Sequence, residues 1–166
     1  MRYEQFADAT IDQILSPEQL TSAKKLSVFT LSSVLLTNDG SGKFTTSPLP
    51  LEIQYTPVQA MLVEDLDGDG RDDVLVSGNF FSYRVEYGPF DASYGSVLKY
   101  GEKGFTCTPA ASLGAYLKGD SRDLQALHTK HCWLFVLVSN NDSKAQVLRV
   151  NAHTSRPTTL AKVKPH

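Results

Sequence analysis

The sequence predicts a mainly β protein with a short helical segment at its N-terminus. Two observations on its 166 residues carry this prediction. From Ser33 onward, short runs of Val, Leu, Ile, Tyr and Phe with a period of two alternate with clusters of Gly, Asn, Asp and Pro, as in strands and turns. Before that point, apolar residues recur every three to four positions, which is helical spacing. We therefore expect a helical segment at 1–26 and a β domain at 27–166.

The helical spacing breaks at Ser16-Pro17, so two short helices are predicted rather than one. Ser16 is suited to cap the second helix, Pro17 fits its first position, and Gln19 can close a capping box. We expect this second helix to run to about Lys25. The apolar positions that define the spacing are Phe6, Ile11, Ile14 and Leu15.

The β domain is expected to contain short strands that are mostly joined by links of hairpin length. Two links are longer, those at residues 78–95 and 110–122. The turn at residues 38–42, Asn-Asp-Gly-Ser-Gly, has residues suited to positive φ. The predicted strands are Ser33–Thr37, Lys43–Ser47, Val58–Glu64, Asp73–Ser77, Ser96–Tyr100, Phe105–Pro109, Asp123–His128, Trp133–Ser139, Ala145–Val150 and Thr158–Val163.

An internal repeat organises these strands. The string Leu-Val-Ser-Gly-Asn at residues 75–79 recurs as Leu-Val-Ser-Asn-Asn at residues 137–141, and each copy follows an apolar strand and a turn. A repeated unit of four short antiparallel strands is typical of a propeller blade. The prediction is therefore a partial blade at 27–50, a blade at 55–110 and a second blade at 120–164.

The segment between the third and fourth predicted strands has the composition of a calcium loop. Counting Asp65 as position one, aspartates stand at positions one, three, five and nine, and a glycine stands at position six, where a calcium loop turns sharply. The backbone carbonyl at position seven is the remaining candidate ligand. Carboxylates this close repel one another unless a cation lies between them. The predicted Ca²⁺ ligands are Asp65, Asp67, Asp69, Asp73 and the backbone carbonyl of Arg71.

The loop is not that of an EF-hand, which needs a bidentate Glu at position twelve and a helix on each side. Here position twelve is Val76, and strands precede and follow the loop. The sequence therefore predicts a strand–loop–strand calcium site. The alternative is an exposed acidic turn whose Asp and Gly residues serve turn geometry alone.

This loop resembles the hallmark of FG-GAP/VCBS-type propeller repeats, a strand followed by Asp-x-Asp-Gly-Asp-Gly-x-x-Asp and a second strand. Residues 65–73 match that pattern, and strings such as Ser-Pro-Leu-Pro at 47–50 and Asp-Ala-Ser at 91–93 resemble the C-terminal part of large secreted VCBS-repeat proteins of Bacteroidota type. The resemblance covers nearly the whole chain. It implies a calcium-stabilised, non-catalytic repeat module in secreted or cell-surface proteins. Thr129-Lys130-His131 stands where the second blade would carry its loop, so no second site of this kind is expected.

Composition and charge exclude several classes of protein. The 16 Lys+Arg and 18 Asp+Glu residues give a net charge of -2 and a pI near 6.1, without the basic face that a dedicated nucleic-acid binder needs. No stretch approaches the roughly 20 apolar residues of a membrane span, and the first residues do not resemble a signal peptide. Cys107 and Cys132 are too few for a disulfide framework, so they form either one bridge or two buried thiols.

Three functions stay open at this level: a calcium-stabilised binding or structural module, a carbohydrate-active enzyme or accessory domain, and an assembly unit without a ligand. Aromatic residues crowd the long link after Asn79, where they form either a recognition surface for a protein or glycan partner or a small core. Because apolar blade faces need covering, we expect the isolated chain to form a homo-oligomer, with a dimer favoured. The aromatic residues are Phe80, Phe81, Tyr83, Tyr87, Phe90 and Tyr94.

Overall fold

A computed structural model of the chain describes residues 3–82, 86–102, 104–130, 134–141 and 143–150. The chain divides into two compact units, an N-terminal unit, Met1–Leu31, and a β unit, Ser32–His166. No helix in the described part of the chain is long and apolar enough to cross a membrane.

Over its described residues, the N-terminal unit contains three short helices, one more than predicted, because Thr10 begins a new helix of its own. The Gln13 side chain accepts the Thr10 backbone N–H at 3.0 Å, and Gln19 accepts that of Ser16 at 2.9 Å. Each of these hydrogen bonds is one half of a capping box, at the start of α2 and of α3 respectively. The last helix ends before the predicted residue Lys25. In its final turn the hydroxyl groups of Thr21 and Ser22 donate to backbone carbonyls of the same helix. The helices are α1 (Tyr3–Ala7), α2 (Ile11–Ile14) and α3 (Pro17–Ser22).

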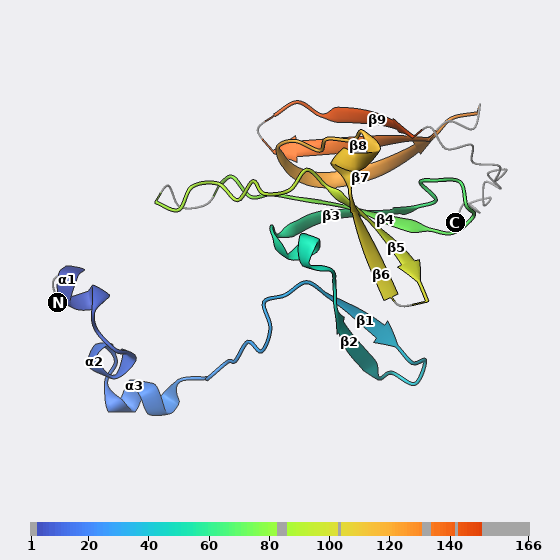
Figure 1. Ribbon diagram of the computed structural model, residues 1–166. Helices are drawn as coiled ribbons and strands as arrows, with labels where there is room; N and C mark the ends of the chain where they lie inside the picture. The colour runs from blue at the N-terminus through green and yellow to red at the C-terminus, as the bar shows by residue number, and fades with distance from the viewer. Residues whose placement is uncertain (1–2, 83–85, 103, 131–133, 142, 151–166) are drawn as a thin grey trace, which may run out of the picture. The chain divides into compact units, whose positions relative to one another are not determined.

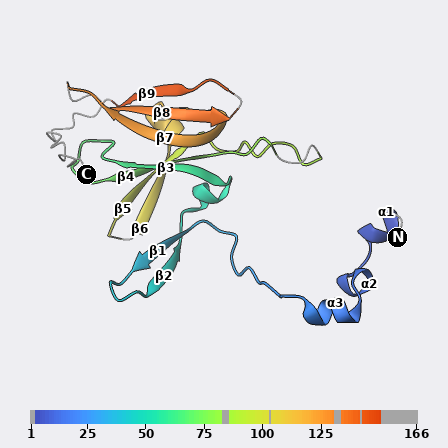
Figure 2. The ribbon, with the colours of Figure 1, turned by 180° about the vertical axis from the view of Figure 1, so that it is seen from behind.

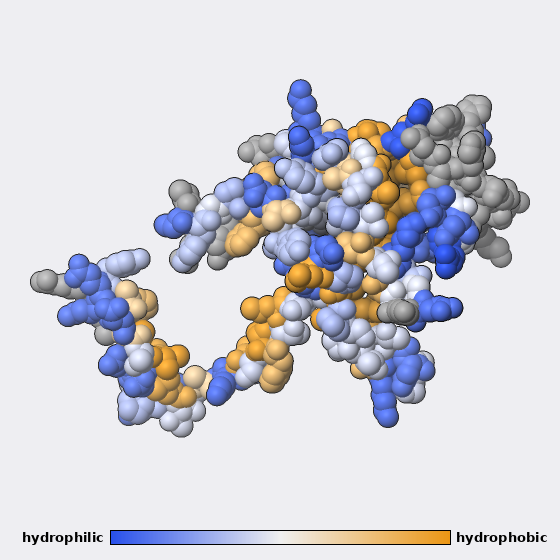
Figure 3. All heavy atoms as spheres, viewed as in Figure 1, coloured by the Kyte–Doolittle hydropathy of each residue, from blue (hydrophilic) through white to orange (hydrophobic). Residues whose placement is uncertain are grey.

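The N-terminal unit exposes much of its apolar surface. No residue of its three helices is buried. Apolar side chains continue along the segment after α3, which Figure 3 shows in orange. The apolar face of these helices is therefore not covered within the unit. The exposed apolar residues after α3 are Leu26, Val28, Phe29 and Leu31.

The β unit is built from antiparallel strands, which confirms the prediction of a mainly β fold. The strands are β1 (Val34–Asn38), β2 (Phe44–Pro48), β3 (Val58–Glu64), β4 (Asp73–Gly78), β5 (Ser96–Gly101), β6 (Gly104–Pro109), β7 (Asp120–His128), β8 (Leu134–Asn141) and β9 (Gln146–Val150). Strands β1 and β2 form a hairpin, β3–β6 form a four-stranded meander, and β7–β9 form a three-stranded meander (Figures 1 and 2). Two short 3-10 helices, η1 (Leu51–Gln54) and η2 (Ala110–Leu113), lie in the links.

The strand bounds agree with the prediction to within two residues at every described strand end except the start of β7. That strand begins at Asp120 rather than Asp123, because Asp120 and Ser121 pair with Asn141 and Asn140 beyond a bulge. These paired residues are polar, so hydrophobic alternation does not mark them as a strand. The predicted strand Thr158–Val163 and the residue Trp133 lie outside the described residues.

A shared core lies between the two meanders. On β4 and β5, neighbouring side chains point to opposite faces of the sheet. Leu75 and Val97 therefore face the three-stranded meander, while Val76 and Leu98 pack with Ile53 of η1 on the other face. Burial on both faces explains why β4 reads as a continuous apolar run. The core between the meanders consists of Ala60, Leu75, Val97, Ala110, Leu117, Leu124, Val136 and Val138.

Candidate metal centre

The acidic loop joins β3 to β4 and folds around the buried side chain of Asp65. One carboxylate oxygen of Asp65 accepts the Gly68 N–H at 2.7 Å, and the other accepts the Gly70 N–H at 2.9 Å. Both glycines have positive φ, 79° and 87°, which side-chain-bearing residues adopt only with strain. The pair Glu64–Asp73 closes the β3–β4 ladder directly below the loop. The Asp-Gly spacing in the sequence is thus the spacing that the turn requires.

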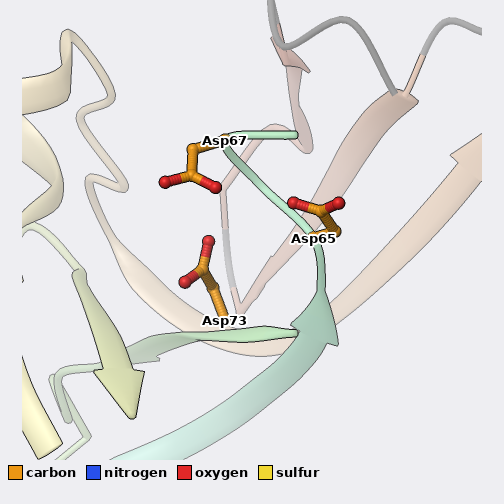
Figure 4. A group of neighbouring side chains, drawn as sticks. All are labelled: Asp65, Asp67 and Asp73. Atoms are coloured by element: carbon orange, nitrogen blue, oxygen red, sulfur yellow. The ribbon is translucent and has the colours of Figure 1, made fainter. Parts of the chain in front are cut away.

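Three of the predicted ligands, Asp65, Asp67 and Asp73, bring their carboxylates together (Figure 4). One oxygen of each lies within 4.8 Å of the other two. Asp65 and Asp73 are buried and Asp67 is exposed, so the group is open to solvent on one side. Carboxylate oxygens are the ligands that Ca²⁺ prefers. The donor set of this acidic triad therefore fits a hard divalent cation.

The other two predicted ligands, Asp69 and Arg71, pair with each other. The Arg71 guanidinium lies 2.8 Å from one carboxylate oxygen of Asp69, and its backbone N–H donates to the other oxygen at 2.8 Å. The hydrogen bond from the Arg71 side chain lowers the pKa of the Asp69 carboxyl. The arginine side chain is mostly exposed, so solvent screens this ion pair. The ligand roles of Asp69 and of the Arg71 carbonyl, like those of the three converging aspartates, remain predictions.

Lys99, on β5, belongs to the site although the sequence did not indicate it. Its ammonium group contacts a carboxylate oxygen of Asp67. This hydrogen bond lowers the pKa of the Asp67 carboxyl and raises that of the Lys99 amino group. The strand register places Lys99 there, because Val74 pairs with Leu98 and the next residues, Asp73 and Lys99, follow at the same end of both strands.

Asp73 differs from Asp67 in the direction of its pKa shift. Burial raises the pKa of the Asp73 carboxyl, although Lys99 and a 3.2 Å hydrogen bond from the Leu66 N–H act in the opposite direction. A carboxyl whose folded-state pKa is raised favours folding while it is protonated, and that contribution is lost as the pH rises through the folded-state pKa. The ionised Asp73 is therefore a cost to the metal-free protein at neutral pH.

We expect Asp73→Asn to raise the melting temperature of the metal-free protein at pH 7. The amide oxygen can still accept the Leu66 N–H, while the buried charge is removed. The gain should shrink as the pH falls from about 7 to 4, because wild-type Asp73 becomes protonated. Thermal melts in chelator across this range measure the effect, with the exposed Asp72→Asn as the control for net charge. A variant that is less stable than wild type at pH 7 would contradict the argument.

A cavity of about 410 Å³ adjoins the acidic triad, between the two meanders. Its walls are mainly apolar and come from β4, β5, β8, β9 and η2. Four charged residues also line it, Asp67, Asp73, Lys99 and Arg149. The size and the apolar lining are those of a small-molecule site. Two members of the triad thus line the same cavity.

The long link between β4 and β5 forms a projecting arm (Figures 1 and 2). Phe80 and Phe90 exchange two backbone hydrogen bonds of 2.9 Å near its base. The Arg122 guanidinium lies 5.3 Å from the centre of the Phe80 ring, within cation–π range. Tyr83 lies outside the described residues. The aromatic side chains exposed on the arm are Phe81, Tyr87, Phe90 and Tyr94.

Of the two cysteines, Cys107 lies in the part of the chain that the structure describes. Cys107, on β6, is half-buried, and burial raises the pKa of its thiol. Cys107 is a free thiol in the structure, and Cys132 lies outside the described residues.

Fold and site together define a mainly β protein with an acidic loop that offers three carboxylates to a cation. Comparison of the chain with protein-family models, curated proteins and solved structures gives no match. The resemblance to FG-GAP/VCBS repeats, and what it implies, therefore stay predictions.

Proposed function

We propose that the chain is a calcium-binding, non-catalytic repeat module of FG-GAP/VCBS type. The observation that carries this proposal is the convergence of Asp65, Asp67 and Asp73 in the loop where the spacing predicted ligands. A calcium ion would balance three carboxylates that otherwise repel one another. Its role would be to stabilise the β3–β4 hairpin.

We propose further that the two meanders are propeller-type blades. The repeated strings support this interpretation, because residues 75–79 begin within β4 and residues 137–141 end β8, and each of these strands is the second of its meander. The predicted strand Thr158–Val163 would be the fourth strand of the second blade. Propellers typically close with about four to eight blades. We propose that further blades, or other copies of the chain in a homo-oligomer, cover the exposed faces.

The arm is the proposed contact surface of this module. Its exposed aromatic side chains provide a large contact area at low cost in side-chain entropy. A protein or a glycan partner fits such a surface. In line with the resemblance, we propose that the module acts outside the cytoplasm, in a secreted or cell-surface protein.

Calcium is expected to raise the melting temperature of the protein, and a chelator to lower it. A ligand that binds only the folded state stabilises it by about 2.7 kcal/mol at a hundredfold excess over its dissociation constant. Asp67→Ala should abolish this dependence, and because Asp67 is exposed the loss of its contacts with Lys99 and the Asp69 N–H should lower the free energy of unfolding by no more than about 1 kcal/mol. Differential scanning fluorimetry with calcium or chelator measures both effects.

The matched control for this experiment is Asp91→Ala, which removes an exposed carboxylate from the arm. This variant should keep the full response to calcium. If the melting temperature of metal-free wild-type protein does not change with calcium, the proposed function is wrong.

A second candidate function is glycoside hydrolysis, which one observation favours. The pKa values of the Asp67 and Asp73 carboxyls shift in opposite directions, and both residues line the same cavity. Glycosidases use such a pair, with one carboxyl protonated and one ionised. Hydrolysis of a polysaccharide in the presence of chelator, lost in Asp73→Asn, would favour this function over calcium binding.

A further inference from the structure

We infer that Lys99 is a built-in competitor of calcium, which holds the cation position at Asp67 in the metal-free protein and sets the calcium concentration at which the loop is loaded. The inference rests on the proposed calcium site and adds a residue from a different strand to it. Lys99 lies 32 residues from Asp67 in the sequence. Its contact with the acidic triad is therefore a property of the fold and not of the loop motif.

The position of Lys99 supports this role. Its side chain lines the cavity beside Asp73, so the aliphatic stem lies along an apolar wall while the ammonium group reaches Asp67. The charge of Lys99 also acts on Asp73 and Asp69. Arg71, the cation of the loop itself, is paired with Asp69. Among the ion pairs of the described residues, that of Lys99 is thus the one that reaches the triad.

Calcium and the Lys99 ammonium cannot share the same oxygen of Asp67 without strong repulsion, so calcium has to displace the ammonium. An exposed ion pair of this kind changes an equilibrium constant by about 1.5- to 5-fold. Repulsion between Ca²⁺ and the displaced ammonium, which stays tethered nearby, adds to this factor. We therefore expect removal of the Lys99 charge to tighten calcium binding by about 3- to 20-fold.

The competition gives the site two properties. Without calcium, Lys99 partly neutralises the loop and keeps it folded. With calcium, it weakens the affinity, which moves the site toward the range of about 10⁻⁴ to 10⁻³ M that extracellular calcium modules use. A loop with these properties would be loaded at extracellular calcium concentrations and empty at lower ones.

Isothermal titration calorimetry with CaCl₂ at low ionic strength tests the inference on the full chain. Lys99→Met keeps the length and apolar character of the stem and removes the charge. Lys99→Arg keeps the charge and should bind calcium about as wild type does. Lys43→Met removes an exposed lysine from the β1–β2 turn and controls for net charge, so its affinity should change less than about 2-fold.

The expected result is a dissociation constant about 3- to 20-fold lower for Lys99→Met than for the Lys43→Met control. The melting temperature is a second readout. In chelator, Lys99→Met should have a lower melting temperature than wild type. When calcium is added, the melting temperature of Lys99→Met should rise more than that of wild type. Circular dichroism checks that the variant is folded, and Lys99→Gln replaces it if it is not.

The outcomes separate this inference from the proposed function. If wild type and Lys99→Met bind calcium equally, or the variant binds more weakly, Lys99 is not a competitor, while the calcium site stands. If Lys99→Met binds calcium and wild type does not, Lys99 excludes calcium from the loop, which supports the competition and contradicts the proposed function of the natural chain. If neither wild type nor any variant binds calcium, the proposed function is wrong, and the inferred role of Lys99 is wrong as well.

Discussion

Leu117→Ala is expected to lower the free energy of unfolding of the β unit by about 3 to 5 kcal/mol, the usual cost of a fully buried leucine. Leu117 is 0% exposed and belongs to the core between the two meanders. Its methyl groups also lie against Gly95, where an added Cβ would be 3.0 and 3.3 Å from the two methyl carbons. Truncation therefore leaves a cavity where the arm, the η2 link and both meanders meet.

Urea denaturation of the full chain in chelator measures this loss. The control is Leu113→Ala, a change of the same size four residues earlier in the same link, at a side chain that is 61% exposed. We expect the control to cost less than about 1 kcal/mol. Equal losses in the two variants would mean that Leu117 does not hold the meanders together.

Leu117 also shows why the strands could be predicted and part of the core could not. The strands alternate apolar and polar residues between clear turn residues, and β3 matches its predicted range Val58–Glu64 in full. The link that carries Leu117 has no period, so the sequence predicted only a connection between Ala110 and Arg122. Its burial depends on two meanders closing over it, which is a tertiary effect.

In the candidate metal centre, too, some residues could be predicted from the sequence and others could not. The spacing of Asp65, Asp67 and Asp73 predicted that these residues share one loop, because a turn with glycine at fixed positions determines their geometry locally. Lys99 reaches the same point only through the register of β4 against β5. The pairing of Asp69 with Arg71 is a choice of side-chain direction, about which residue spacing carries no information.

Asn79 is the last residue of the first of the two repeated strings, at 75–79 and 137–141. This residue is 2% exposed and has a φ of 87°. Its side-chain amide donates to the carbonyls of Ser93 at 2.8 Å and of Gly119 at 3.0 Å, and its side-chain oxygen accepts the Ser93 N–H at 3.1 Å. Asn79 thus closes the base of the arm and joins it to the start of β7.

Asn79→Gly is expected to lower the free energy of unfolding by about 2 to 4 kcal/mol, because half-buried backbone groups of Ser93 and Gly119 lose their partner. Asn79→Ala should lower the free energy of unfolding by about 1 kcal/mol more than Asn79→Gly. Alanine adopts positive φ only with strain, whereas glycine adopts it without strain. Comparing the two variants separates the hydrogen bonds from the backbone conformation.

The matched control is Asn141→Gly, at the equivalent position of the other repeat. Asn141 is exposed and its side-chain amide donates to an Asp120 carboxylate oxygen at 3.2 Å, so we expect the loss of this hydrogen bond to lower the free energy of unfolding by about 1 kcal/mol. Hydrogen exchange of the Phe80 and Phe90 amides adds a local readout. Because their mutual hydrogen bonds lie directly beyond Asn79, exchange should quicken in Asn79→Gly more than the global loss of stability accounts for. Unchanged relative protection of these two amides would show that the arm holds its shape without Asn79.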